Sequence, residues 1–258
     1  MNIKATEIVF SPTGGTQKVS QIIASQWSNN RQVIDLSKTD IDFSEYIINE
    51  DDMVLIAIPV FGARAPAIAI DRLKQIRGNN ARCTLVCVYG NGDYGSTLSE
   101  MKTAADESNF KVIAAIAAIA QHSIIPEYAR NRPDDEDFKQ LSDFAAQILG
   151  KKDIIQTKLE RKRTKEVNIK ETKPEPPAEP PLPKANESCV QCGLCRQTCP
   201  VEAITSEYIS DIGKCIFCMR CIRQCPHGCR EVNEDVISTV ALSLKEMCSK
   251  RKENELFL

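Results

Sequence analysis

Two stretches of the sequence carry cysteines at the same spacing. Residues 189–200 are CVQCGLCRQTCP and residues 215–226 are CIFCMRCIRQCP, so each follows the pattern C-x2-C-x2-C-x3-C-P. Three thiolates on one tight loop can bind three irons of a cubane cluster, and a fourth that precedes a proline can turn toward a second cluster. Structural zinc instead prefers two separated cysteine pairs in a closed tetrahedral site. The repeat therefore predicts two [4Fe–4S] clusters rather than zinc.

A second stretch suits a different ligand. Residues 11–16, SPTGGT, follow an apolar run and precede a helical pattern. A turn at this place offers backbone N–H groups and a helix N-terminus to an anion, and its hydroxyls add donors. It has no lysine and no G-x-G-x-x-G, so it is neither a Walker A loop nor a dinucleotide fingerprint. It suits a phosphate monoester, and an ordinary polar turn is the alternative. The candidate ligands are Ser11, Thr13, Gly14, Gly15 and Thr16.

These sites need elements to hold them. Residues 1–150 alternate apolar, strand-like runs with helical patterns, which predicts right-handed crossovers and a doubly wound parallel five-stranded α/β sheet. The run at 52–61 is continuously apolar, as expected of a strand buried on both faces. The alanines of the run at 111–121 would also suit a helix. The predicted strands are 7–10, 31–36, 52–61, 82–90 and 111–121, and the predicted helices are 16–27, 65–76, 96–109 and 134–149.

The loop SPTGGT resembles the FMN-phosphate loop of flavodoxins, of pattern S/T-x-T-G-x-T. In such a sheet the ligand binds at the carboxyl ends of the strands, at the switch point between the first and third. The resemblance implies that the loops 59–66 and 89–95 meet the flavin ring, with Phe61 and Tyr94 (or Tyr89) stacking on it; simple loop packing is the alternative for each aromatic. The candidates in these loops are Pro59, Val60, Phe61, Gly62, Tyr89, Gly90, Asn91, Gly92, Asp93, Tyr94 and Gly95.

The cysteine repeat resembles bacterial two-cluster ferredoxins, a small α+β family. The resemblance implies two ligand sets, Cys189, Cys192, Cys195 and Cys225 for one cluster and Cys199, Cys215, Cys218 and Cys221 for the other. Phe217 and Met219 stand where that family often has glycine. The segment also carries five Lys or Arg against four acids, from which we expect raised reduction potentials, since cations stabilise the reduced cluster.

The chain as a whole resembles flavodoxin-like/ferredoxin fusion proteins of anaerobic bacteria and archaea. The stretches PVFGARAP and QHS…NRPD, at 59–66 and 121–134, look like their PVYGGRVP and EHS…RPD. His122 is thus a weak catalytic candidate beside the flavin, with a structural histidine as the alternative. Contact of Arg64 with the flavin is left open. Cys83, Cys87 and Cys229 are expected to be packing residues, and Cys248 is expected to be an incidental residue of a helix.

Composition divides the chain into four parts. They are a flavodoxin-like FMN domain (1–150), a charged and proline-rich linker (151–188), a two-[4Fe–4S] ferredoxin domain (189–229) and a C-terminal tail (230–258) that forms a helix or a strand followed by a helix. The linker piece KPEPPAEPPLPK favours extended polyproline II. It would let the ferredoxin domain dock on the flavodoxin-like domain and then swing away.

The net charge of −2 argues against a nucleic-acid partner. The longest apolar run, 112–120, is too short to span a bilayer, and the N-terminus lacks a signal-peptide pattern, so we expect no membrane insertion and a cytoplasmic protein. The expected function is electron transfer between FMN and two [4Fe–4S] clusters for soluble redox partners. An FMN-dependent reductase of a small organic substrate or quinone is the alternative, and a redox-sensing regulator is a third. Homodimer formation is left open.

Overall fold

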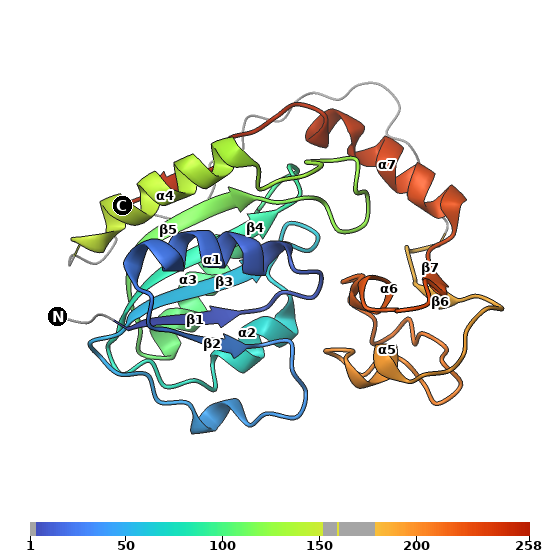
Figure 1. Cartoon of the computed structure of the whole chain (residues 1–258), viewed down its shortest axis with the longest axis horizontal. Coiled ribbons are helices and arrows are strands. Elements are labelled where there is room, and N and C mark those ends of the chain that lie inside the picture. Colours follow the sequence, from blue (N-terminus) through green and yellow to red (C-terminus); the bar gives the residue numbers. More distant parts are fainter. Residues whose placement is uncertain (1–3, 152–158, 160–178) are drawn as a thin grey trace.

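The computed structural model describes residues 4–151, 159 and 179–258. Its elements, in chain order, are β1 (Ala5–Val9), α1 (Gly15–Trp27), β2 (Arg31–Asp35), η1 (Phe43–Glu45), β3 (Met53–Pro59), α2 (Ala67–Leu73), β4 (Arg82–Tyr89), α3 (Thr97–Glu107), β5 (Lys111–Ile119), α4 (Asp135–Leu149), β6 (Lys184–Ala185), α5 (Leu194–Gln197), α6 (Arg220–Arg223), β7 (Arg230–Glu231), α7 (Glu234–Cys248) and β8 (Glu255–Phe257) (Figure 1).

The main sheet has the strand order β2-β1-β3-β4-β5-β8. The first five strands are parallel and β8 pairs antiparallel with β5. The order 2-1-3-4-5 is that of the flavodoxin-like fold. The predicted five-stranded parallel sheet is therefore confirmed, including β5, whose alanines left a helix open. The sixth strand is a correction: β8 has three residues, too few to show a period in the sequence.

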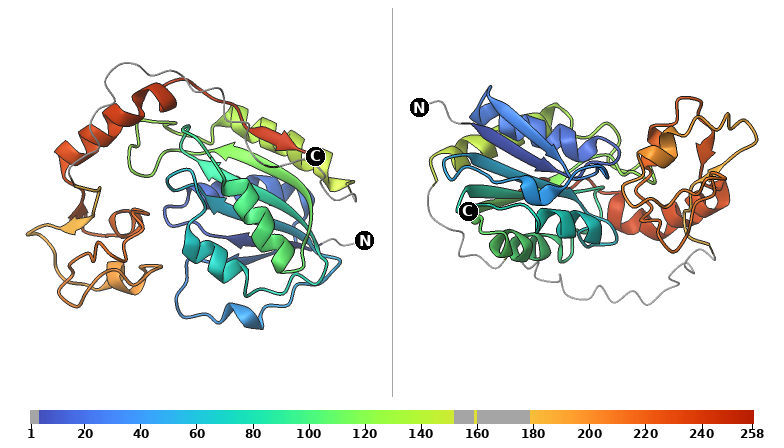
Figure 2. Two further views of the ribbon diagram at one scale, coloured as in Figure 1. Left: turned by 180° about the vertical axis from the view of Figure 1, so that it is seen from behind. Right: turned by 90° about the horizontal axis from the view of Figure 1, so that it is seen from below.

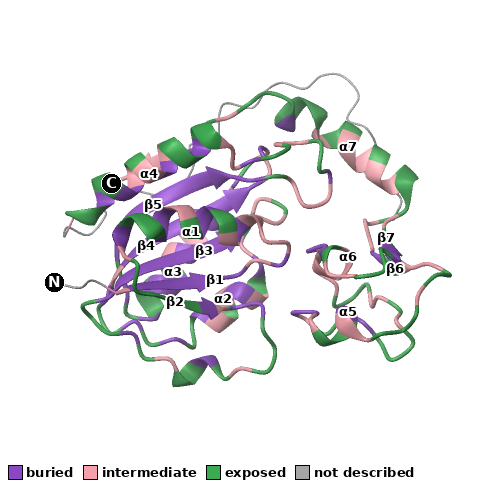
Figure 3. Ribbon diagram, viewed as in Figure 1, coloured by how far each residue is buried: buried purple, intermediate pink, exposed green. Residues whose placement is uncertain are grey.

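Helices cover both faces of this sheet. Figure 2 shows α1 and α4 on one side and α2 and α3 on the other. Central strands are buried on both faces, which explains their continuous apolar sequences (Figure 3). The indole Nε1 of Trp27 donates to the Ala145 carbonyl (3.0 Å) and so ties α1 to α4. The sheet is a rigid platform whose strand ends hold the loops of interest.

The cysteine repeat folds into a small unit with two one-turn helices, α5 and α6, and the strand pair β6–β7. The two cysteine loops share a backbone course. Gln191 and Phe217, at equivalent places of the repeat, have φ values of 56° and 51°. Gly193 and Met219 are also equivalent and have φ values of 83° and 61°. The repeat seen in the sequence is thus a repeat of local structure.

The tail leads back to the main sheet. Asn233 caps the N-terminus of helix α7, and its side chain accepts hydrogen bonds from the N–H groups of Asp235 and Val236. The chain then reaches β5 and pairs with it as β8 (Figure 1). The tail thus has one of the two predicted orders, a strand (β7) followed by a helix (α7), and it ends in a further strand, β8, that was not predicted. The unit that carries the cysteine repeat is consequently held to the sheet from its C-terminal side.

The small unit contacts the larger one near the carboxyl ends of the strands. The Arg72 guanidinium donates to the Leu36 carbonyl (2.7 Å) and to the Pro200 carbonyl (2.9 Å). Ile216 packs against the hydrophobic core of the sheet. Most of the predicted linker lies outside the described residues. None of the helices in the described ranges is long and apolar enough to cross a membrane.

Candidate functional site

A cavity of ≈400 Å³ lies at the carboxyl ends of β1, β3, β4 and β5. This is the switch-point edge of the sheet, where ligands of doubly wound folds bind. Its volume lies within the range of about 300–1,000 Å³ that is usual for single-ligand pockets. Of the predicted flavin ligands, the wall contains Thr13, Gly15, Thr16, Pro59, Val60, Phe61, Gly62, Tyr89 and Gly90.

The loop after β1 is built to hold an anion at one end of this cavity. Gly14 has a left-handed backbone (φ 93°) and turns the chain into α1. The Ser11 hydroxyl accepts from the Gln17 N–H (2.9 Å) and so faces the helix rather than the cavity. Within the described part of the chain, the backbone N–H groups of residues 13–16 have no hydrogen-bond partner. Four free donors around two threonine hydroxyls fit a phosphate group.

The second half of the loop after β4 does not line the cavity. The Asn91 side chain is buried and donates to the carbonyls of Cys248 and Lys250 (2.6 and 2.7 Å). Tyr94 is buried beside Tyr89, and its hydroxyl bonds to the Glu255 carboxylate (3.2 Å). Asn91 and Tyr94, which were expected to contact the flavin, thus bind the C-terminal tail instead. The predicted flavin ligands that lie away from the cavity wall are Ser11, Gly14, Asn91, Gly92, Asp93, Tyr94 and Gly95.

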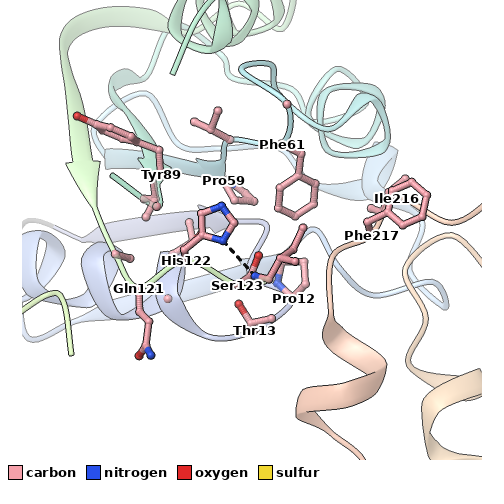
Figure 4. A pocket seen from close by; sticks show the side chains of 18 of the residues that line it. Pro12, Thr13, Pro59, Phe61, Tyr89, Gln121, His122, Ser123, Ile216 and Phe217 are labelled. Carbon is pink, nitrogen blue, oxygen red and sulfur yellow. Dashed lines mark hydrogen bonds between the residues drawn. The ribbon is translucent and has the colours of Figure 1, made fainter. Parts of the chain in front are cut away.

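The loop after β3 forms a tight turn beside the cavity. The N–H of Phe61 donates to the Arg64 carbonyl (2.9 Å), and the N–H of Arg64 donates back to the Phe61 carbonyl (3.2 Å). This turn directs Phe61 into the cavity wall (Figure 4). The Arg64 side chain is 73% exposed and pairs with Glu100 (2.7 Å). Arg64 is therefore not part of the cavity wall.

His122 lies in the cavity wall, in the loop after β5. Its Nδ1 accepts from the N–H groups of Ile124 (3.2 Å) and Ile125 (3.0 Å), so the neutral ring carries its proton on Nε2 (Figure 4). Burial lowers the pKa of the imidazole below 6.5. A Cβ at Gly90 would stand 2.5 Å from the ring, so only glycine there admits the histidine. His122 is a fixed neutral donor in the cavity, with no carboxylate among the side chains that line it.

The cysteines of the repeat surround two separate pockets. One is lined by Cys189, Cys192, Cys195 and Cys225, and the other by Cys199, Cys215, Cys218 and Cys221. Each pocket therefore takes three cysteines from one loop and the fourth from the other loop. This is the crossed grouping that the ferredoxin resemblance implied. Cys229 also borders the first pocket, where its Sγ donates to the Ser188 carbonyl (3.0 Å).

Comparisons with known proteins cover the two parts separately. Residues 184–205 match the family model of the 4Fe-4S binding domain. The chain joins a flavodoxin-like domain to a 4Fe-4S binding domain. The flavodoxin of Streptococcus pneumoniae TIGR4 is 17% identical, with a TM-score of 0.42 over 57% of this chain and 97% of that one. An FMN-bound flavodoxin of Fusobacterium nucleatum is 11% identical, with a TM-score of 0.40 over 57% and 95%. No curated protein sequence matches the chain.

The iron–sulfur domain completes the wall of the cavity in the flavodoxin-like domain. Ile216 and Phe217, from the loop between Cys215 and Cys218, line it together with Pro181. Figure 4 shows Phe217 and Ile216 beside Phe61, although they come from the other domain. Sequence reasoning missed these contacts because they depend on how the domains dock. The glycine-to-phenylalanine departure at 217 was the available signal. The other lining residues that were not among the predicted flavin ligands are Pro12, Val88, Ala120, Gln121, Ser123 and Ile124.

Charge and burial differ between the two cysteine sets. Burial raises the pKa of the Cys218 thiol to about 12 and also raises the pKa values of Cys215 and Cys221. Burial opposes ionisation of Cys225 as well, but nearby backbone N–H groups outweigh it and lower its pKa. Buried thiols bind metal only as thiolates, so a metal bound there would have to supply the compensating positive charge.

Arg230 is a buried cation beside the cysteine pockets. It is 3% exposed, lines the first pocket, and partly offsets the rise that burial causes in the pKa of Cys221 in the second. Its guanidinium donates to the carbonyls of Pro183 (2.9 Å) and Tyr208 (3.1 Å), which fixes it in place. A fixed buried cation stabilises the more negative, reduced state of a cluster. Arg230 thus supplies a structural cause for the raised potentials that the composition predicts.

Proposed function

We propose that this protein transfers electrons between FMN and two [4Fe–4S] clusters, linking two-electron and one-electron carriers. One observation carries the proposal: a single cavity has walls from both domains. Phe61 and Gly62 come from the flavodoxin-like domain, and Ile216 and Phe217 come from a cysteine loop of the iron–sulfur domain. Ile216 directly follows Cys215 and Phe217 directly precedes Cys218. A flavin in this cavity and a cluster on these cysteines would therefore be neighbours.

The residues of the cavity fit FMN. The free N–H groups of residues 13–16 and the hydroxyls of Thr13 and Thr16 would hold the phosphate without a cationic side chain. Phe61 would contact the ring, and the His122 Nε2–H would donate to a ring atom. When bound, FMN supplies the ability to take up two electrons together and release them singly. The protein residues orient the ring and exclude water from one side.

Two clusters follow from the two sulfur-lined pockets. Each pocket has four cysteines, which is the ligand number of a cubane cluster. Exposed Cys192 places one pocket near the surface, where soluble redox proteins would exchange single electrons with it. The other pocket shares Ile216 with the wall of the proposed flavin cavity and so lies nearer to it.

The alternative is a reductase in which the clusters feed a flavin that reduces an organic substrate or quinone. Such a substrate needs space against the ring and a group that moves protons. Phe217 occupies part of the cavity wall, and both backbone bonds to His122 Nδ1 restrict that ring to a single donor position. These observations favour electron transfer between protein-bound carriers.

Anaerobic purification followed by iron, sulfide, zinc and flavin analysis tests the proposal. We expect about eight irons and about one FMN per chain, from two cubanes and one phosphate loop. A reductive titration should then show flavin and cluster bands bleaching in the same preparation. A Cys248→Ser variant serves as control, because Cys248 lies in the tail and borders neither sulfur pocket. Zinc in place of iron, or protein that takes up no flavin, would contradict the proposal.

A further inference from the structure

The two cysteine loops have the same backbone and different surroundings. Gln191 and Phe217 are equivalent, and both have a left-handed backbone. Gln191 is exposed and its carbonyl accepts from the Tyr208 hydroxyl (2.7 Å). Phe217 is half-buried and lines the cavity of the flavodoxin-like domain. The fold of the loop thus tolerates a polar residue here, and only the second loop presents an aromatic ring to a ligand cavity.

Phe217 has a backbone conformation that is unfavourable for a bulky residue, and its side chain cannot stabilise it with a local hydrogen bond. A left-handed backbone is unfavourable for an ordinary L-residue, and it is most unusual for a bulky side chain. Asparagine or aspartate can offset that cost with local hydrogen bonds, and phenylalanine cannot. Residues in strained backbone conformations gather at ligand sites, where surrounding contacts stabilise them. For Phe217, a contact of this kind is available across the domain boundary, where it lines the cavity.

Neighbouring Ile216 already provides the packing between the domains. Its side chain lies against the hydrophobic core of the flavodoxin-like domain. Arg220, on the same loop, donates to the Ser37 hydroxyl (3.0 Å). Docking therefore has its own apolar and polar anchors on either side of Phe217. Phe217 is therefore not needed as an anchor for docking. It lines the cavity beside Phe61, which lines it from the other domain (Figure 4).

Resting on the proposed function, we infer that Phe217 is a flavin-contacting residue supplied by the iron–sulfur domain, and that the cluster site beside it exchanges electrons with the flavin directly. It takes the role expected of Tyr94, which the tail keeps in the core. The site bordered by exposed Cys192 is then the outer one. The route runs from an external one-electron donor protein through the outer cluster and the inner cluster to FMN, or in reverse.

The electrons balance along this route. Reduction of FMN by two electrons oxidises each of the two clusters by one electron, and two protons come from solvent. The external donor protein then returns one electron to each cluster and is itself oxidised. No bond to Phe217 forms or breaks, so Phe217 acts by contact and by excluding water.

The equivalence of the loops provides a matched pair of variants. Phe217→Gln gives the second loop the residue that the first already carries, and Gln191→Phe makes the opposite change at an exposed place. FMN is titrated into flavin-depleted protein with intact clusters, and its Kd is read from flavin fluorescence. An aromatic contact is worth about 0.5–1.5 kcal/mol. We therefore expect Phe217→Gln to weaken FMN binding about 2- to 12-fold and Gln191→Phe to leave the Kd unchanged.

A second measurement follows the electrons. Clusters reduced with dithionite are mixed with FMN at saturating concentration, and flavin bleaching is timed by stopped flow. Phe217→Gln should slow bleaching while Gln191→Phe does not. If Phe217→Gln loses iron, Phe217→Leu replaces it, since leucine keeps the apolar volume without the ring. Unchanged Kd and unchanged rate in an iron-replete Phe217 variant would overturn the inference. Failure of the unmodified protein to bind FMN would instead refute the proposed function.

Discussion

Removal of the Asn91 side chain should release the C-terminal tail. Asn91 lies in the loop after β4, is 3% exposed, and makes three hydrogen bonds to the tail backbone. Its amide donates to the carbonyls of Cys248 (2.6 Å) and Lys250 (2.7 Å), and its carbonyl oxygen accepts from the Lys252 N–H (3.1 Å). Asn91 has a φ of 66°, so Asn91→Gly removes these bonds without backbone strain.

The size of the effect follows from these contacts. Each net hydrogen bond is worth about 1 kcal/mol, which gives about 3 kcal/mol for the three. Since about 1.4 kcal/mol corresponds to a factor of ten, the open form of the tail should become about 100-fold more populated. The pairing of β8 with β5 and the side chain of Asn254, which accepts from the Ile119 N–H (2.8 Å), would still oppose release.

Hydrogen exchange of the peptide 249–258 measures this opening. We expect its amides to exchange much faster in Asn91→Gly, while amides in the central strands keep their protection. Asn79→Gly is the matched control, because Asn79 also has a left-handed backbone (φ 48°) but an exposed side chain. Equal exchange of the tail in the two variants would show that the Asn91 bonds do not hold it.

Three further results are expected. Burial lowers the folded-state pKa of His122 below 6.5, so the unfolded chain binds the proton more readily, and the free energy of unfolding should fall as pH drops through 6.5. His122→Asn should flatten this pH dependence. A titration midpoint of His122 above 6.5 in the folded protein, measured by NMR, would contradict the reasoning. Cys225→Ala should lose about half of the iron while Cys229→Ala keeps it; iron loss from both would make Cys229 a ligand. Arg230→Gln should lower the cluster potentials in potentiometric titration, because it removes a buried cation; unchanged potentials would refute this role.

Much of the fold could be predicted because its signals are local. The strands β3 and β5 are continuous apolar runs since both faces are buried, and the run alone identifies them. The cysteine spacing is similarly local, because three ligands of each pocket lie on one short loop. The phosphate loop was predicted in the same way, from a turn that joins a strand to a helix.

The remaining features depend on contacts between distant residues. Tyr94 was expected at the flavin because its loop ends a central strand, but Glu255 holds its hydroxyl from 161 positions away. The sequence of β8 has no period that distinguishes it from a loop. Phe217 was visible as a departure from the ferredoxin pattern, and its place at the cavity required the docking of two domains. The sequence thus indicated which segments form the candidate site, but it did not show which residues of the other domain these segments contact.

The strand β8 makes the iron–sulfur domain an insertion rather than an appendage. The flavodoxin-like domain begins before it in the chain and is completed after it, since β8 covers the edge of β5. A fragment that stops at Gly150 would therefore leave the N–H and C=O groups of β5 unpaired at an apolar edge. Such edges recruit strands from other molecules. The flavodoxin-like domain of this protein should be isolated only together with its last strand, supplied in trans or by circular permutation.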